Sequence, residues 1–492
     1  MKKIGFDNDK YVEIQSKNIA KRVSKFNKLY LEFGGKLFDD NHASRVLPGF
    51  APDAKLKMLL NIKDKVEMML VINAEHIESN KMRADLGISY RDDLMRLIDS
   101  IETTGLQVGG IVITHYHKQV NAEKIRKKLE RAGYKVAYHY TIPNYPNDIE
   151  TILSEKGFGK NEYIKTTKDI VVVTAPGPGS GKMATCLSQM YHDNLNGIKA
   201  GYAKFETFPV WDLPLNHPVN LAYEAATIDL DDVNMIDPFY FEAYKKIAVN
   251  YNRDIDTFPI LNELLIKILG KQVYKSPTDM GVNTISSCII DDKVCSSASK
   301  NEIIRRYYSI LNDVRKDAVN EELAIKMDNI MKKAQVTVED RKVVKACLEI
   351  AKDTKKPAAS IELNDGTIIT GKTTRLLGAS SSCLLNAIKH EAKLPDIDLL
   401  SKEVLEPIQK VKTEVLNSKN PCLHTDETLI ALAIGSKDNE ECLKALNALS
   451  LLKGTEMHSS VILSDVDIKT IKKLGIRLTM EPVYQTKKLF HI

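Results

Sequence analysis

The sequence predicts a multidomain α/β protein. Its N-terminal domain is expected to be a parallel-sheet, P-loop-like domain, followed by a helical middle region and a smaller C-terminal α/β domain. Three observations support this prediction. Short apolar runs alternate with amphipathic segments in the N-terminal part, and one of these runs leads into a glycine-rich loop that opens a helix. The chain also has 492 residues, which is enough for about three domains.

The N-terminal elements follow from apolar periodicity. We expect one helix over 9–33, because its apolar residues have helical spacing, and further helices over 92–101 and 122–132. Strands are expected at 68–72, 110–114, 135–140 and 170–173. Alternating units of this length predict a parallel sheet with right-handed crossovers, in which ligands bind beyond the carboxyl ends of the strands.

The segment 169–192, DIVVVTAPGPGSGKMATCLSQMYH, contains the predicted phosphate site. Gly177, Gly179 and Gly181 can take positive φ and allow a ligand to approach the backbone. Ser180 follows the prolines of the loop, and Lys182 lies in the first turn of the next helix. The unpaired amides at a helix start favour an anion, so we expect Gly177, Gly179, Ser180, Gly181, Lys182 and Thr185 to bind the phosphorylated ligand.

This loop resembles a Walker A loop in Gly181-Lys182 and in its flanking strand and helix. It departs from that pattern because Pro176 replaces the first glycine and Met183 replaces the Ser or Thr that binds Mg²⁺. Thr185 is about 200° further around the helix and cannot simply replace it. The expected cofactor is ATP or another nucleotide, whereas Met183 puts Mg²⁺-assisted hydrolysis in doubt. The alternative is an ordinary strand-to-helix turn with a solvated lysine.

Histidines follow two of the predicted strands. His76 comes after the first strand, and His115 and His117 come after the second. His115 and His117 would share one face if the strand extends that far, which suits two metal ligands or a general base and a phosphate donor. Hydrogen-bonded histidines without a catalytic role are the alternative. We expect His115, His117 and Lys182 to be the catalytic residues.

The predicted domain boundaries are 1–249, 250–355 and 356–492. The proline- and aromatic-rich segment 205–220 is expected to cover the phosphate site, and 288–291 is expected to be a strand. Residues 250–355 otherwise show helical spacing. In the last domain we expect strands at 359–363, 367–370 and 461–463, with helices at 380–390, 401–416, 425–434 and 438–451.

Composition limits the partners. The net charge is +5, with 70 basic and 65 acidic residues interspersed, so nucleic acid is not expected. No apolar core follows the charged start MKKIGFDNDK and no run of about 18 apolar residues occurs, so neither a signal peptide nor a membrane is expected. The odd number of cysteines, 7, includes no C-x-x-C pair and fits a reducing cytoplasm. The expected partner is a phosphorylated small molecule, and the oligomeric state is left open, a homo-oligomer included.

Four blocks also carry a resemblance across the whole chain: APGPGSGKMATCLSQMYH, FPVWDLPLNHPVNLAYEAATIDLDDVNMIDPF, SPTDMGVN and LNDGTIITGKTTRLLGASSSCLLNAIKH. They resemble an uncharacterised bacterial protein family that is classified only as a domain of unknown function. The resemblance implies a multidomain soluble protein. It implies no catalytic role for any residue.

The sequence therefore leaves three classes of function. The leading hypothesis is an enzyme that handles phosphoryl or nucleotidyl groups, in which Lys182 and the loop amides hold phosphate and a histidine moves a proton. The second is a non-catalytic regulatory protein that binds a phosphometabolite and whose other domains move or assemble in response. The third is a metal-dependent hydrolase that uses His115 and His117.

Overall fold

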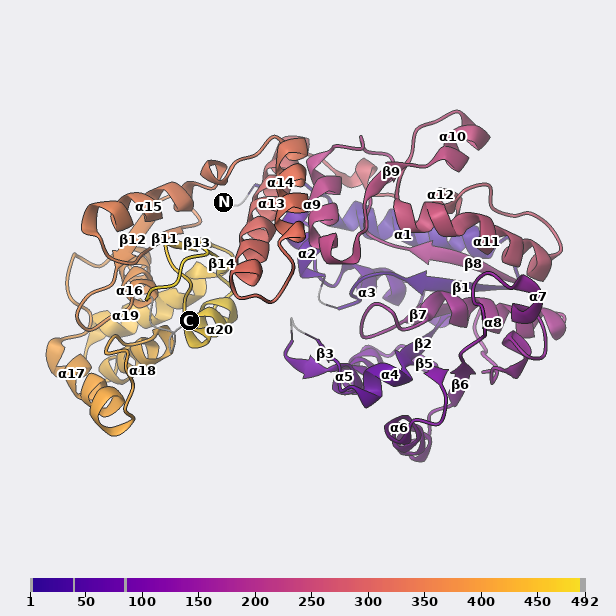
Figure 1. Ribbon diagram of the computed structural model, residues 1–492, viewed down its shortest axis with the longest axis horizontal. Helices are drawn as coiled ribbons and strands as arrows, with labels where there is room; N and C mark the ends of the chain where they lie inside the picture. Colours follow the sequence, from indigo (N-terminus) through magenta and orange to yellow (C-terminus); the bar gives the residue numbers. More distant parts are fainter. Residues whose placement is uncertain (1–2, 39, 84–85, 487–492) are drawn as a thin grey trace. The chain divides into compact units, whose positions relative to one another are not determined.

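The computed structural model describes residues 3–38, 40–83 and 86–486, and it divides the chain into two compact units. The N-terminal unit contains residues 4–224 and 230–298, and the C-terminal unit is built mainly from residues 299–492. Each unit has its own sheet, so the protein is a multidomain α/β protein, as predicted (Figure 1).

A six-stranded sheet in the order β6-β5-β2-β7-β1-β8 forms the centre of the N-terminal unit. All neighbouring strands are parallel, which confirms the predicted parallel sheet. Its strands are β1 (Lys28–Phe33), β2 (Val66–Asn73), β5 (Gln107–Tyr116), β6 (Val136–Tyr140), β7 (Ile170–Thr174) and β8 (Ala200–Phe205).

The strand order reverses between β2 and β7. From β2 the chain proceeds to β5 and β6 at one edge, and it then returns to place β7 on the other side of β2. Open parallel sheets bind ligands at such a reversal, beyond the carboxyl ends of the strands. The glycine-rich loop leaves β7 at this position.

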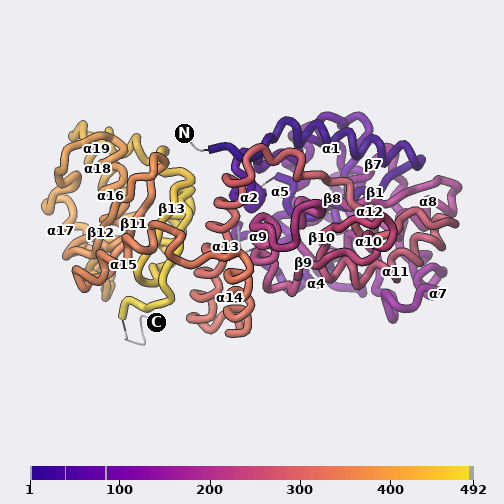
Figure 2. The backbone as a smooth tube through the Cα atoms, turned by 90° about the horizontal axis from the view of Figure 1, so that it is seen from above, coloured from indigo at the N-terminus to yellow at the C-terminus, as the bar shows by residue number. Residues whose placement is uncertain are grey.

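Helices α8 (Lys182–Leu195) and α11 (Asn252–Leu269) pack against each other at this sheet (Figure 2). Their apolar side chains, such as Leu187 and Leu261, share one core with alternate strand residues such as Tyr30 and Val171. The other helices up to the end of this unit are α1 (Asn8–Val23), α2 (Asn41–Val46), α3 (Ala54–Leu60), α4 (Ala74–Glu78), α5 (Tyr90–Thr103), α6 (Val120–Arg131), α7 (Ile149–Ile152), α9 (Pro218–Ala226), α10 (Pro238–Tyr244) and α12 (Pro277–Met280).

The prediction of one helix over 9–33 is wrong in its second half. Helix α1 ends at Val23, and residues 28–33 form β1, which pairs with β7 and β8. All six residues of β1 are buried, so burial between two neighbouring strands overrides the helical spacing. Strand β8 was not predicted. The expected strand at 288–291 is also absent, because a 3-10 turn (Ser286–Cys288) and a helix start flank that segment.

Small two-stranded sheets complete the unit: β3 (Met82–Arg83) pairs with β4 (Ile88–Ser89), and β9 (Asn234–Ile236) pairs with β10 (Val249–Tyr251). The predicted helical domain 250–355 differs from the observed division. Its first part, including α11, packs into the core of the N-terminal unit. Its remainder belongs to the C-terminal unit, which begins within α13 (Asp292–Arg315).

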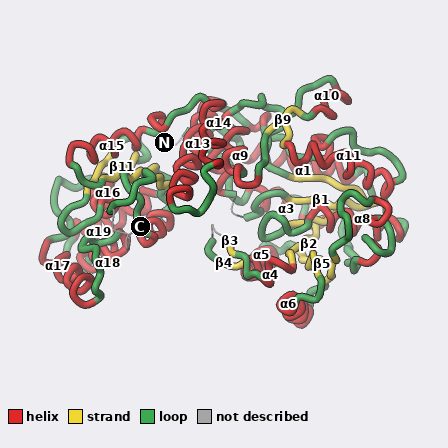
Figure 3. The backbone as a smooth tube through the Cα atoms, in the orientation of Figure 1, coloured by secondary structure: helices red, strands yellow, loops and turns green. Residues whose placement is uncertain are grey.

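The C-terminal unit has a four-stranded mixed sheet in the order β12-β11-β13-β14, surrounded by helices (Figure 3). Ser360 of β11 donates to the carbonyl of Val343 in α15, whereas Ala359 and Ile361 pack in the core formed with α16. These two helices therefore cover opposite faces of the sheet. The expected strand at 461–463 is wrong by several residues, because β13 ends at Ser459.

The bounds in this unit are as follows: β11 (Ala358–Glu362), β12 (Ile368–Lys372), β13 (Glu456–Ser459), β14 (Arg477–Met480), α14 (Glu322–Ala334), α15 (Lys342–Thr354), α16 (Ala379–Glu391), α17 (Lys402–Lys410), α18 (Thr425–Gly435), α19 (Glu440–Ala448) and α20 (Asp465–Lys473). No helix in the described residues is long and apolar enough to cross a membrane.

Candidate functional site

The glycine-rich loop is held in place by β2 and β5, the two strands that precede β7 in the sheet order. Thr114 of β5 donates to the carbonyl of Ser180 at 2.7 Å, and Asn73 of β2 donates to the carbonyl of Gly179 at 3.2 Å. Ser180 Oγ donates to the carbonyl of Gly177 at 2.6 Å and closes the turn. The carbonyl groups are thus engaged by the sheet, and the loop has a fixed shape.

Helix α8 begins directly after this loop. Gly181 is its N-cap residue with φ of 83°, and as a glycine it has no side chain to accept a hydrogen bond from the first turn. Gly179 also has positive φ, 72°. Amides in the first turn of a helix have no acceptor within the helix and carry the positive end of its dipole. Lys182 is half-buried at the same end. This arrangement provides donors and positive charge for an anion.

A cavity of about 480 Å³ opens at the carboxyl ends of the strands. Its walls come from the loop and α8, from the end of β5, from β6 and the chain after it, from the ends of β1 and β8, and from α11. The lining residues are Glu32, Thr114, His115, His139, Tyr140, Thr141, Ile142, Tyr145, Phe158, Asn161, Pro178, Gly179, Ser180, Gly181, Lys182, Met183, Ala184, Lys204, Glu206, Arg253, Asp254 and Thr257. The volume is that of an ordinary small-molecule site.

His115 and Lys182 both line this cavity, whereas His117 does not. His115 is exposed and has φ of 52°, so the backbone turns sharply at the end of β5. The ring Nε2 of His117 lies 3.1 Å from the side-chain nitrogen of Gln119. The structure therefore assigns the two predicted catalytic histidines to different surroundings.

His76 lies beside the loop but outside the cavity lining. Its ring packs edge-on against Tyr90, with 5.2 Å between centroids, and its Nε2 is 3.3 Å from Nζ of Lys81. Burial and the neighbouring Lys81 lower the pKa of His76. The ring is consequently neutral near pH 7 and packs as part of the support for the loop.

Gly177 and Thr185, two predicted ligand-binding residues, are not among the lining residues. Gly177 packs against Tyr90, where an added Cβ would lie 2.4 Å from the phenolic oxygen. Thr185 is fully buried, and no described residue forms a hydrogen bond with its Oγ1. Its position on α8 turns it away from the ligand side, as its offset from Met183 requires.

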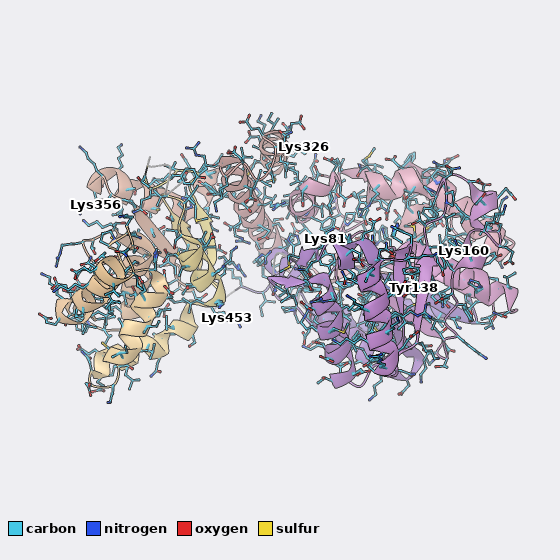
Figure 4. The ribbon with its side chains drawn as sticks, turned by 60° about the horizontal axis from the view of Figure 1, so that its bottom comes forward. Lys81, Tyr138, Lys160, Lys326, Lys356 and Lys453 are labelled. Atoms are coloured by element: carbon cyan, nitrogen blue, oxygen red, sulfur yellow. The ribbon has the colours of Figure 1, made fainter. Side chains whose placement is uncertain are left out.

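The segment 205–220 does not cover the cavity as predicted. Of this segment only Glu206 is in the lining, while residues such as Phe208 and Trp211 line a separate small pocket. The wall is supplied by α11 and by residues 139–161 instead. Lys160 belongs to the second of these segments (Figure 4). Its Nζ lies 4.6 Å from the ring centroid of Tyr140.

Sequence reasoning missed a polar cluster on the wall formed by β1, β8 and α11. Lys204 Nζ lies 3.2 Å from Oε1 of Glu206 and 3.0 Å from the hydroxyl of Tyr251, and it also pairs with Asp254. Tyr251 donates to the other oxygen of Glu206. The only signal in the sequence is a charged residue inside each apolar strand: Glu32 in KLYLEF and Lys204 in AGYAKF.

The pKa values of this cluster depart from their usual range. Burial raises the pKa of Asp254 to about 6, and repulsion from Glu206 adds to this effect against the attraction of Lys204. Burial alone would lower the pKa of Lys204, but Asp254 and Glu206 raise it. A carboxyl group with this pKa can exchange a proton near neutral pH.

The described residues contain no group of three or more His, Cys, Asp or Glu side chains arranged to hold a metal ion. His115 and His117 therefore gain no third ligand from the described chain. The polar segment 33–45 contains further charged residues, of which Asp39 lies outside the described residues. Asp40 caps α2 and pairs with Lys55 at 2.9 Å.

Family comparisons cover nearly the whole chain. Residues 4–335 match the family described as "Domain of unknown function DUF1846, N-terminal", and residues 339–490 match "Domain of unknown function DUF1846, C-terminal". A protein of Streptococcus pyogenes serotype M5 (strain Manfredo), named UPF0371 protein SpyM50764, is 52% identical over 492 residues, which is 100% of each chain. UPF0371 protein str1377 of Streptococcus thermophilus (strain CNRZ 1066) is similar to the same extent, with 52% identity over 492 residues and 100% of each chain. The chain therefore belongs to the bacterial family described as the domain of unknown function DUF1846.

Proposed function

We propose that the protein binds a phosphorylated small molecule or nucleotide in the cavity and transfers its phosphoryl or nucleotidyl group. One observation carries the proposal: the N-terminal turn of α8, Lys182, the imidazole of His115 and the carboxyl group of Asp254 line the same cavity. A phosphate group needs donors and positive charge, and transfer needs a base within reach.

In the proposed reaction, the loop amides and Lys182 hold the phosphate and stabilise the charge that develops on its oxygens. An acceptor hydroxyl attacks phosphorus, forming one P–O bond, and the P–O bond to the leaving group breaks. The proton of the hydroxyl passes to His115 or Asp254, and the leaving oxygen takes a proton from the second of these groups or from water. No oxidant or reductant takes part.

The residues at the loop fit a nucleotide phosphate better than a bound Mg²⁺. Met183 lines the cavity where the Walker A pattern has a hydroxyl, and a thioether is a poor ligand for Mg²⁺. The cation at the site is then Lys182. We propose that the phosphate is neutralised by protein groups alone.

Calorimetric titration of the full chain with inorganic phosphate and with a panel of nucleotides and sugar phosphates tests binding. The Lys182→Ala variant should bind about 10- to 100-fold more weakly, since a charged hydrogen bond of this kind contributes about 1.5 to 3 kcal/mol. Lys156→Ala is the matched control, because Lys156 is exposed and outside the cavity. Equal affinity in parent and Lys182→Ala would refute the site.

Turnover is measured with the compounds that bind. Release or transfer of labelled phosphate supports an enzyme. Tight binding, with no turnover for every acceptor tested, supports a non-catalytic regulatory protein instead and refutes the transfer step.

A further inference from the structure

The cavity contains hydrogen-bond acceptors that no described residue satisfies, and the first is on Glu32. This side chain is only 7% exposed at the end of β1. Tyr202 donates to its Oε2 at 2.6 Å. No described residue donates to Oε1, although Glu32 lines the cavity. A carboxylate oxygen without a donor from the described residues can accept a hydrogen bond from a bound molecule.

The second acceptor is on Asp254, at the start of α11. Its Oδ2 pairs with Lys204, while Oδ1 receives no hydrogen bond from the part of the chain that the structure describes. Glu206 differs, because its two oxygens pair with Lys204 and Tyr251. Asp254 therefore has an oxygen free for a ligand, and Glu206 serves to position Lys204.

The third acceptor is on the wall formed by β6. His139 is 4% exposed, and its Nε2 has no hydrogen-bond partner among the described residues. Burial lowers the pKa of His139 to about 3, so the ring is neutral, and a hydrogen bond to the backbone of Glu162 occupies the other nitrogen. Nε2 is then an unsatisfied acceptor on a residue of the cavity wall.

The charges of the lining decide which kind of donor fits. The acidic lining residues are Glu32, Glu206 and Asp254, and the basic ones are Lys182, Lys204 and Arg253. Lys204 already pairs with two of the acids, and Arg253 pairs with Asp232 at 3.4 Å. Glu206 and Asp254 share Lys204, and Glu32 accepts from Tyr202, so a neutral hydroxyl group is a donor that suits the remaining acceptor oxygens.

We propose that the ligand is a phosphorylated sugar, whose phosphate lies at the glycine-rich loop and whose hydroxyl groups donate to Glu32, Asp254 and His139. This inference rests on the proposed phosphate site and names the substrate class for it. The geometry that carries it is the presence of three unsatisfied acceptors and one anion site in a single cavity of about 480 Å³.

The test compares ligands with equal phosphate and different hydroxyl content. The full chain is titrated by calorimetry with glucose 6-phosphate, glucose 1-phosphate and ribose 5-phosphate, with n-hexyl phosphate as the hydroxyl-free match and inorganic phosphate as the reference. AMP and 2′,3′-dideoxy-AMP form a second arm, which separates a free sugar phosphate from the ribose of a nucleotide. At least one hydroxylated ligand should bind about tenfold or more tightly than its hydroxyl-free partner.

Glu32→Gln and Asp254→Asn each replace one acceptor oxygen by a donor of nearly the same shape. Each should weaken the preferred sugar ligand about tenfold and leave inorganic phosphate unchanged. Glu263→Gln is the control, because Glu263 is exposed on the same helix as Asp254 and outside the cavity. Thermal unfolding of each variant identifies any that fail to fold, and the ligand comparison on the parent decides the question without them.

The outcomes separate this inference from the proposed function. If Lys182→Ala weakens phosphate binding but hydroxylated and hydroxyl-free ligands bind equally, the phosphate site stands and the sugar inference is overturned. If inorganic phosphate and every phosphorylated ligand fail to bind the parent, both are overturned. Loss of sugar preference in Glu32→Gln and Asp254→Asn, with inorganic phosphate unaffected, supports the inference.

Discussion

Lys204 and Asp254 form an ion pair on the wall of the cavity, with 2.5 Å between Nζ and Oδ2. Their side chains are each only 12% exposed. Lys204 comes from the end of β8 and Asp254 from the first turn of α11, so the pair joins segments 50 residues apart. It fixes α11 over the open end of the sheet, where the two residues form one wall of the site.

Removing the lysine should destabilise the N-terminal unit. Lys204→Met leaves Asp254 and Glu206 buried without their cation, which costs about 3 to 5 kcal/mol in free energy of unfolding. Urea denaturation of the full chain measures the loss. Lys199→Met, at an exposed lysine before the same strand, should change it by less than about 0.5 kcal/mol. Equal stabilities of the two variants would contradict a structural role for the pair.

The glycine-rich loop should not tolerate a Cβ at Gly181. This residue has φ of 83°, and an added Cβ would lie 3.1 Å from Cγ2 of Thr114. Gly133 also has positive φ, 92°, but has nothing within 4 Å, so Gly133→Ala should cost only about 1 kcal/mol. Gly181→Ala should cost about 1 to 3 kcal/mol more and weaken phosphate binding. Denaturation and calorimetry check both effects, and similar losses in both variants would exclude the steric contact.

Restoring a hydroxyl at position 183 tests how far the loop resembles a nucleotide loop. In Met183→Thr the new hydroxyl can ligate Mg²⁺, so nucleotide affinity should become about tenfold tighter with Mg²⁺ than with a chelator. The parent and Met183→Leu should show no such dependence. If Met183→Thr behaves like Met183→Leu, the loop binds its anion without a metal position.

The C-terminal unit should lose stability in acid. Burial alone would raise the pKa of Glu456 from its ordinary value of 4.5. The nearby Arg305, Arg341 and Arg477 outweigh this effect and lower the pKa to about 2. A depressed folded-state pKa gives stability that is complete above pH 4.5 and is lost as the pH falls toward 2, about 3 kcal/mol in all.

Hydrogen exchange at β13 and β14 in the full chain measures this effect of pH. The quantity compared is the protection factor, which removes the intrinsic pH dependence of amide exchange. In Glu456→Gln these amides should have lower protection factors at neutral pH, and the protection factors should no longer fall between pH 4.5 and 2. Glu349→Gln, at an exposed carboxylate on α15, should keep the dependence of the parent. Protection factors of the parent protein that stay constant over this pH range would contradict the role of Glu456.

Much of the N-terminal sheet could be predicted from the sequence, because its strands β2, β5, β6 and β7 are continuous apolar runs separated by helices. The same reasoning failed for β1, which follows α1 after a short turn and shares its basic and apolar composition. It also failed for β8, whose short AGYAKF sequence has no strong strand signal. The same reason explains which residues of the candidate site could be expected. The loop, Lys182 and His115 adjoin predicted strands, whereas Glu32 and Lys204 lie in the strands that were missed.

The features that depend only on neighbouring residues follow from local sequence. Gly179 and Gly181 adopt positive φ and Lys182 begins a helix after a buried strand, because glycine, proline and β-branched residues constrain their own backbone. Glu32, Lys204 and Asp254, in contrast, share a wall with that loop because of how distant segments fold together. Their meeting depends on which strands pair in parallel and on where α11 packs. Those choices are set by burial of side chains from distant segments, which no local pattern encodes.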